Sequence, residues 1–366
     1  MTIRRVGVIL IALLSWAGLV SAETPFLNGL AQVTVGPSTV PNHIGDVNPY
    51  GIFQVPVNSG NLVKGHFIIS NFNDSTNLQG TGTTLMDVAP DGTVKLFAQI
   101  EPNTLPAGQA CPGGIGLTTA LVVLKTGWVI VGSLPTSDGT SATMQAGCLL
   151  VLNNMGQVVE TFAGGDINGP WDMTVFDSGS VAALFVTNVL NGTVAASPHT
   201  VHQGTVVRLV LSVSTSAMPS ISTSTIIGSH FPERTDPAAL VIGPTGVAFA
   251  ADRDILYVND SLGNRIAAIP DAMTRGATGS SGVTLSNKGS LNDPLGLTLA
   301  PNGDLIAANG GDGNLVEVTP QGRQVAIRLV DSAGNPPGAG NLFGLFAVSN
   351  AIYFVDDGTN TLNVLH

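Results

Sequence analysis

Residues 293–310 of the chain read DPLGLTLAPNGDLIAANG, and this stretch decides the fold. Two short apolar runs flank the turn Pro301-Asn302-Gly303-Asp304, in which Asn-Gly supplies the positive φ that a tight turn needs. The stretch is therefore predicted to be a β-hairpin. The same pattern occurs about fifty residues earlier, in GPTGVAFAADRDILYVND at residues 243–260, which indicates an internal repeat.

Laying the chain against itself gives six units of this kind. They open at Asn48, Gly114, Asn168, Gly243, Asp293 and Asn341. The apolar runs are short and β-branched and none has a helical period, which excludes a helical solenoid. The sixth unit has three strands, and the strand AQVTVG at residues 31–36 has no partner in its own unit. We therefore predict an all-β, six-bladed β-propeller of four-stranded antiparallel blades whose last blade is closed by an N-terminal strand.

The first 22 residues predict export. Arg4 and Arg5 precede an apolar run from Val6 to Val20, and Val20-Ser21-Ala22 supplies small residues for cleavage. A membrane anchor is the alternative, but the run is shorter than the roughly 20 residues that a span needs. We therefore predict a signal peptide at residues 1–22, a single propeller domain at residues 23–366, and a secreted or periplasmic protein without a membrane span.

The net charge limits the class of binding partner, and the cysteine content predicts a disulfide. The net charge of −11 becomes −13 when a leader with two Arg and no acid is removed (−11 − 2). Phosphate would repel such a chain, so nucleic acid is excluded as a partner. Cys111 and Cys148 are the two cysteines, and in an oxidising compartment they are predicted to form a disulfide, with two buried free thiols as the alternative.

Polar residues recur where the first strands of the units begin and where the second strands end. In a propeller these turns crowd one mouth of the central channel, so we expect ten residues there: Asn48, Asn71, Asn188, Asn259, Asp260, Asp293, Asn309, Asp312, Asn341 and Asp356. Calcium takes six to eight oxygen ligands, and Asn188, Asp260, Asn309 and Asp356 are the candidate ligands for Ca²⁺ in the channel. The alternative is that Asn and Asp end these strands because their side chains satisfy turn backbone.

The fifth unit carries a family resemblance. NDPLGLTLAPNGDLIAANGGDGNLVEVTPQG, residues 292–322, resembles an NHL repeat, in which P-x-G opens a strand, a second P-x-G turn follows, and the next strand ends in Asp or Asn. The fourth unit matches from Gly243 to Ile269, and the first three are looser. The resemblance implies the propeller fold and is nearly silent on chemistry.

A more distant resemblance concerns function. VNDSLGN, residues 258–264, is similar to propellers of the gluconolactonase and senescence-marker type, which hold one divalent ion at the channel mouth with a Glu, two Asn or Asp ligands and a catalytic Asp. The chain has Asn48-Pro49-Tyr50-Gly51 where that family opens with Glu-Gly-Pro, so the expected Glu is missing.

Two functions follow as hypotheses. The first is an exported scaffold, expected to be monomeric, that binds an unidentified protein, small molecule or carbohydrate. The second is a metal-dependent, calcium-type lactonase, esterase or lyase with its site at the channel mouth. No nucleophile motif occurs in the sequence, so no catalytic residue is assigned at this stage.

Overall fold

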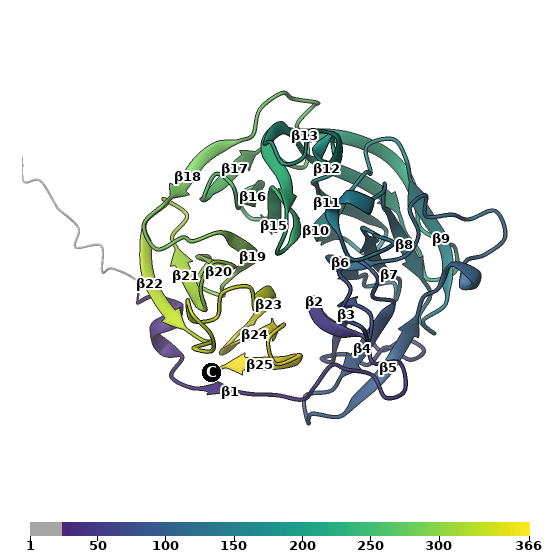
Figure 1. The fold of residues 1–366 in the computed structure, drawn as a ribbon, viewed down its shortest axis with the longest axis horizontal. Helices are drawn as coiled ribbons and strands as arrows, with labels where there is room; N and C mark the ends of the chain where they lie inside the picture. Colours follow the sequence, from purple (N-terminus) through teal and green to yellow (C-terminus); the bar gives the residue numbers. More distant parts are fainter. Residues whose placement is uncertain (1–23) are drawn as a thin grey trace, which may run out of the picture.

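The structure, a computed structural model, describes residues 24–366, and the predicted signal peptide lies outside the described residues. Six antiparallel sheets stand around one axis like the blades of a propeller (Figure 1). The predicted fold class is thereby confirmed. Within residues 24–366, no helix has the length and apolar character that crossing a membrane requires.

Each blade is a meander that begins at the axis and moves outward. Blades one to three are β2 (Val47–Gln54), β3 (Phe67–Asn73), β4 (Thr84–Val88), β5 (Val94–Gln99); β6 (Leu117–Val123), β7 (Val129–Ser133), β8 (Cys148–Leu152), β9 (Val158–Ala163); and β10 (Pro170–Asp177), β11 (Val181–Asn188), β12 (Val201–Ser212), β13 (Ser220–Asp236), β14 (Leu240–Ile242). Blades four to six are β15 (Pro244–Ala250), β16 (Ile255–Asp260), β17 (Arg265–Pro270), β18 (Val283–Asn287); β19 (Pro294–Leu299), β20 (Leu305–Asn309), β21 (Asn314–Val318), β22 (Gln324–Leu329); and β23 (Leu342–Val348), β24 (Ala351–Asp356), β25 (Thr361–Leu365), β1 (Val33–Thr34). The short helices are η1 (Phe26–Gly29), η2 (Pro102–Thr104), η3 (Ser141–Thr143) and α1 (Thr193–Ala196).

The outer edge of the sixth blade comes from the other end of the chain. Strand β1 pairs antiparallel with β25, with Val33 opposite Leu365 and Thr34 opposite Val364. The Ala31 and Gln32 amides both donate to the His366 carbonyl at 2.9 Å. In Figure 1 the purple N-terminal segment accordingly runs beside the yellow C-terminal strand.

Apolar side chains between successive blades form the core. Ile130 and Leu149 of blade two, for example, pack with Leu184 of blade three, and all three are fully buried. Hydroxyl groups add links at the inner strands: Ser70 Oγ donates to the Thr118 carbonyl at 2.7 Å, and Thr187 Oγ1 donates to the Thr245 carbonyl at 2.9 Å. Each bond reaches from the second strand of one blade to the first strand of the next, so the hydrogen-bonded contacts hold the inner ring together.

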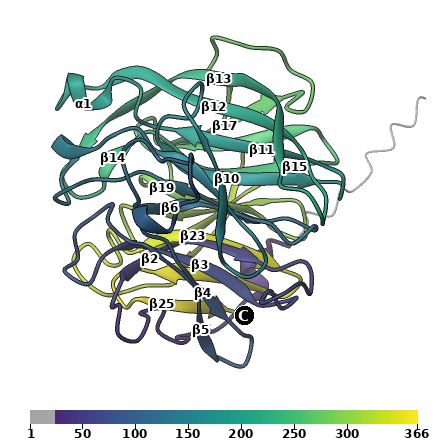
Figure 2. The same ribbon diagram turned by 90° about the vertical axis from the view of Figure 1, so that its right-hand side faces the viewer.

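Blade three departs from the regular pattern. Its β13 continues past the blade to Asp236 and then turns back into a fifth strand, β14, which pairs Arg234 with Ile242. Seen edge-on in Figure 2, β14 and α1 lie on the same side of the disc. The sequence analysis predicted neither β14 nor α1, and this extension supplies part of the candidate site described below.

The predicted disulfide is confirmed. Cys111 and Cys148 are bonded, with their Cα atoms 5.3 Å apart. The bond ties the loop that leads into blade two to β8, the third strand of that blade. Both cysteines are buried.

Candidate functional site

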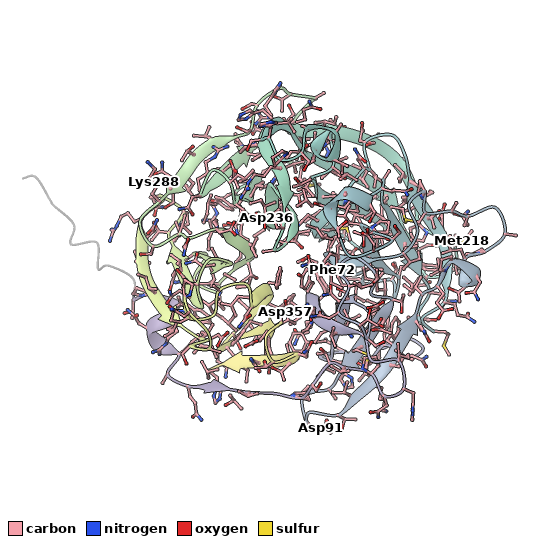
Figure 3. All side chains as sticks on the ribbon, viewed as in Figure 1. Phe72, Asp91, Met218, Asp236, Lys288 and Asp357 are labelled. Carbon is pink, nitrogen blue, oxygen red and sulfur yellow. A yellow bond between two sulfur atoms is a disulfide. The ribbon has the colours of Figure 1, made fainter. Side chains whose placement is uncertain are left out.

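The mouth of the channel at which the inner strands begin holds a pocket of about 310 Å³. We call it the mouth pocket. Its polar side chains are Asn48, Gln79, Asp236, Asp293 and Asp357, with Tyr50 and Phe343 at its base. These residues come from blades one, three, five and six, so only the closed ring brings them together. Figure 3 shows Asp236 and Asp357 near the axis, and Asp91 and Lys288 at the rim.

Two of the pocket residues stand immediately before a proline at or near the start of an inner strand, in β2 and β19. Asn48 precedes Pro49 and has φ 62°, and Asp293 precedes Pro294 and has φ 52°. Left-handed backbone is unfavourable for residues with a side chain, although Asn and Asp tolerate it best. Nine other non-glycine residues among the described ones share this conformation, so it fixes the backbone of Asn48 and Asp293 without singling out the pocket.

The extension of blade three covers one side of the pocket. Asp236 at the end of β13 accepts hydrogen bonds from the Ala238 amide at 2.9 Å and from Arg234 Nη2 at 3.0 Å. Across the mouth, Gln79 Nε2 donates to the Ala238 carbonyl at 2.8 Å. The turn after Asp236 is thus fixed at both sides, and it shields the carboxyl groups beneath it from solvent.

Shielding changes the protonation of the pocket. Burial, and to a smaller extent the adjacent Asp356 carboxylate, raises the pKa of Asp357 to about 7. Burial also raises the pKa of Asp293, with a smaller contribution from Asp236 and an opposing one from Arg234. Asp293 Oδ1 is buried without a hydrogen-bond partner in the described part of the chain, and no described residue donates to the Asp357 carboxyl. Two carboxyl groups are therefore free to exchange protons with a ligand.

An aromatic cluster closes the channel below the pocket. The Tyr50 ring stacks on Phe343 at 3.7 Å between centroids and on Phe72 at 4.4 Å, and Trp171 lies 6.5 Å from Phe343. Burial, and then the charge of Asp357, raise the pKa of Tyr50 well above its usual value. The mouth pocket is therefore a dead end rather than the entrance of an open channel.

These shifts predict how stability depends on pH. Asp357 has a folded pKa of about 7, whereas an aspartate in an unfolded chain has its ordinary value of 3.8, so between these pH values the folded state holds a proton that the unfolded state has lost. We expect its contribution to the unfolding free energy to be lost as the pH rises from about 4 to 7. In urea titrations at pH 5 and pH 8, Asp357→Asn should lose less stability than the wild type, whereas the rim control Asp91→Asn should follow the wild type. Equal losses in all three proteins would contradict the assignment.

The structure brings two of the ten predicted mouth residues, Asn48 and Asp293, to the pocket. The other eight do not line it, because their side chains bond to nearby strand ends and turns. Asn71 donates to the Thr39 carbonyl, Asn259 to the Leu295 and Gly296 carbonyls, and Asn341 to Asp331, while Asp312 accepts from Asn292, Asn309 and Asn314. For these residues the structure favours the turn-stabilising interpretation.

The four predicted calcium ligands are engaged in the same way. Asn188 accepts from the Asn168 amide at 3.0 Å, Asp260 from Arg265 Nε at 2.8 Å and Asp356 from the Thr359 amide at 3.0 Å, while Asn309 donates to the Ser290 carbonyl at 2.9 Å. Across residues 24–366, no three His, Cys, Asp or Glu side chains form a group that would hold a metal ion. The residues as arranged here do not form a calcium site, so no reaction step is assigned to a metal and calcium binding stays a prediction.

Sequence reasoning missed Asp357 and Asp236. Asp357 directly follows the predicted Asp356 in the run VDDGTN, so its position next to a predicted mouth residue could have identified it. Asp236 had no such signal, because it reaches the mouth only through the extension of β13, which the repeat pattern does not include.

Comparisons with known proteins give the fold class first. The chain resembles a gluconolactonase of Xanthomonas campestris (14% identity, TM-score 0.53, covering 92% of this chain and 95% of the other). It also resembles the calcium-binding protein regucalcin of Agrobacterium tumefaciens (15%, 0.52, 91% and 95%) and virginiamycin B lyase of Staphylococcus aureus (12%, 0.50, 91% and 98%). At these identities the likeness establishes the propeller fold alone.

A more particular match lies in the second half of the chain. Residues 233–333 match the family model described as SMP-30/Gluconolactonase/LRE-like region, which covers less than a third of the chain. This segment contains Asp236 and Asp293. No curated protein sequence matches the chain. The comparisons do not confirm the NHL-repeat label, which stays a prediction.

Proposed function

We propose that the chain is a hydrolase or lyase that opens a small lactone or related cyclic ester in the mouth pocket. The observation that carries the proposal is the Asp357 carboxyl, which lines the pocket, receives no hydrogen bond from a described residue and has a pKa of about 7. A general base works best when its pKa lies near the working pH. The match of residues 233–333 to a family model that includes gluconolactonases supports this second of the two hypotheses over the binding scaffold.

The Asp357 carboxyl acts in turn as base and acid. In hydrolysis, Asp357 takes a proton from a water molecule whose oxygen attacks the lactone carbonyl. When the ring C–O bond breaks, the leaving alkoxide takes the proton that Asp357 received from the water, which returns Asp357 to its ionised form. The turn after Asp236 covers the pocket and lowers the local dielectric constant, which strengthens the electrostatic interactions between the carboxyl group and the reacting atoms.

Asp357→Asn tests this assignment. We expect the variant to lose about 100-fold or more in kcat/KM for lactone opening, because a positioned general base contributes about 10²- to 10⁴-fold. In a pH-stat assay with a panel of sugar and aliphatic lactones, wild-type kcat/KM should rise with pH and level off above about pH 7, where Asp357 is ionised.

The matched control is Asp91→Asn, the same change at the exposed rim of blade one, which should retain wild-type activity. Equal activity of Asp357→Asn and Asp91→Asn would contradict the role of Asp357. Saturable lactone binding without turnover by the wild type would instead favour the scaffold function for the same pocket.

A further inference from the structure

The opposite end of the channel contains a second cavity, of about 210 Å³. We call it the lower cavity. All six inner strands line it. On strands that reach both spaces, the cavity residues come later in the strand than those of the mouth pocket: Phe53 lies after Tyr50 on β2, and Phe346 after Phe343 on β23. The aromatic cluster around Tyr50 separates the two spaces. The lower cavity is therefore distinct from the site proposed above.

One position in each inner strand distinguishes blades two and three from the other four. The position is glycine in four blades, where Gly51, Gly246, Gly296 and Gly344 pack against backbone of the next blade. In blade three it is Asp172, since the Asp172 amide donates to Thr187 Oγ1 at 3.0 Å as the Gly51 amide donates to Ser70 Oγ at 2.9 Å.

In blade two the same position is Thr119. The Ser70 hydroxyl donates to the Thr118 carbonyl in the same way that the Thr187 hydroxyl donates to the Thr245 carbonyl. Thr118 therefore corresponds to Thr245, and the next residue, Thr119, corresponds to one of the four glycines. Adjacent blades two and three thus place a hydroxyl and a carboxyl where the repeat elsewhere has no side chain. Departures from a local rule of this kind are expected at functional positions.

The Asp172 carboxyl has no compensating charge. Its Oδ2 accepts a hydrogen bond from the Val247 amide at 3.0 Å, and it is the one ionisable side chain among the described residues that line the cavity. The strands that pack against β10, namely β6, β7, β11 and β15, contain no Asp, Glu, His, Lys, Arg, Tyr or Cys. Burial raises the pKa of Asp172 to about 7, against the opposing hydrogen bonds from the Met173 and Val247 amides.

Thr119 is 5% exposed, and its hydroxyl oxygen is buried without a hydrogen bond to any described residue. Because this oxygen is closed off from the cavity as well as from solvent, it is not available to a ligand there. The cavity therefore offers one carboxylate, while Phe53, Phe249 and Phe346 provide aromatic surface.

We propose that the lower cavity binds a small organic cation, a protonated amine with a short apolar body. An ammonium group donates hydrogen bonds that the Asp172 carboxylate accepts, and its charge supplies the missing partner. The rings favour a cation or an apolar group over an anion. A metal ion fits less well, because one carboxylate and hydroxyls leave calcium short of its six to eight oxygen ligands. The volume lies below the 300–1,000 Å³ typical of drug-sized ligands and so selects a small amine.

Benzylammonium is the probe, and benzyl alcohol is its neutral counterpart of nearly the same shape. In calorimetric titrations of the whole protein at pH 8, we expect benzylammonium to bind at least tenfold more tightly than benzyl alcohol. Asp172→Asn should abolish this preference, whereas Asp91→Asn should keep it. Binding should persist in Asp357→Asn, which places it away from the mouth pocket.

The pH dependence of binding by the wild type tests the proposal even if the Asp172→Asn variant does not fold. Because the amine binds the ionised carboxyl, its affinity should fall about tenfold per pH unit below pH 7, and saturating amine should lower the Asp172 pKa followed by carboxyl ¹³C NMR. Equal affinity for the amine and the alcohol would overturn the proposal, as would full binding by Asp172→Asn or no saturation at millimolar benzylammonium. None of these outcomes depends on lactone turnover, so this proposal and the proposed function fail separately.

Discussion

Replacing Gly296 by alanine is expected to lower the unfolding free energy by about 3 kcal/mol or more. A Cβ built at this position meets the backbone carbonyl oxygen of Phe343 on the inner strand of blade six, as well as the side chain of Leu345. Overpacking a close-packed interior costs about 1–3 kcal/mol, and more when the obstacle is backbone that cannot rotate away. Here the obstacle belongs to a closed ring, so any outward shift of blade six disturbs its contact with blade one as well.

Urea denaturation of Gly296→Ala measures this loss. The matched control is Gly29→Ala in η1, where the added Cβ meets no atom within 4 Å and the change should stay within about 0.5 kcal/mol. A Gly296→Ala protein as stable as the Gly29→Ala protein would show that the inner strands tolerate a wider ring than the structure has.

Removing the disulfide should cost about as much. Cys111 and Cys148 are 37 residues apart, and in the chain-entropy model closing a loop of this length stabilises the folded state by about 4 kcal/mol. We therefore expect the Cys111→Ser/Cys148→Ser double variant to unfold at clearly lower urea concentration than the oxidised wild type. The loop before blade two should also become more accessible to proteases, because the disulfide joins it to β8.

Reduction of the wild type is the internal control. Dithiothreitol should shift the wild-type unfolding curve towards that of the double variant and leave the double variant unchanged. If reduction leaves the wild-type curve in place, the bond contributes little, and the buried contacts of the two cysteines carry the stability of this loop.

The repeat pattern predicted the architecture well because its signals are local. In the fifth unit, Pro294 and Gly296 mark an inner strand, and Asn302-Gly303 marks the hairpin that follows; Gly303 indeed has φ 83°. The disulfide between Cys111 and Cys148 was likewise predictable, because the chain has two cysteines and a predicted export signal. Blade three was the exception, because β13 continues past the length of a blade strand and β14 has no counterpart in the other units.

The candidate site was only partly predictable. Asn48 and Asp293 were expected at the mouth on the grounds of strand position, and both line the pocket. The same reasoning also selected residues such as Asn259 and Asp260, whose side chains hold neighbouring backbone and turns. Residue type and position along a strand do not distinguish these two uses, since an Asn at a strand end can face a carbonyl or a cavity.

The sequence by itself determined the number of blades, the course of their strands and the cysteine pair, because turn geometry and strand periodicity depend on residues close together in the chain. Only the tertiary structure decided which carboxyl groups meet and which of them lose their solvent. Asp293 and Asp357 share a pocket because blades five and six stand side by side in the ring and because a turn from blade three lies over the mouth. Asp172 lies in the lower cavity for a similar reason. The sequence shows that an aspartate stands at position 172, but only the meeting of six strands at one axis buries it without a counter-charge.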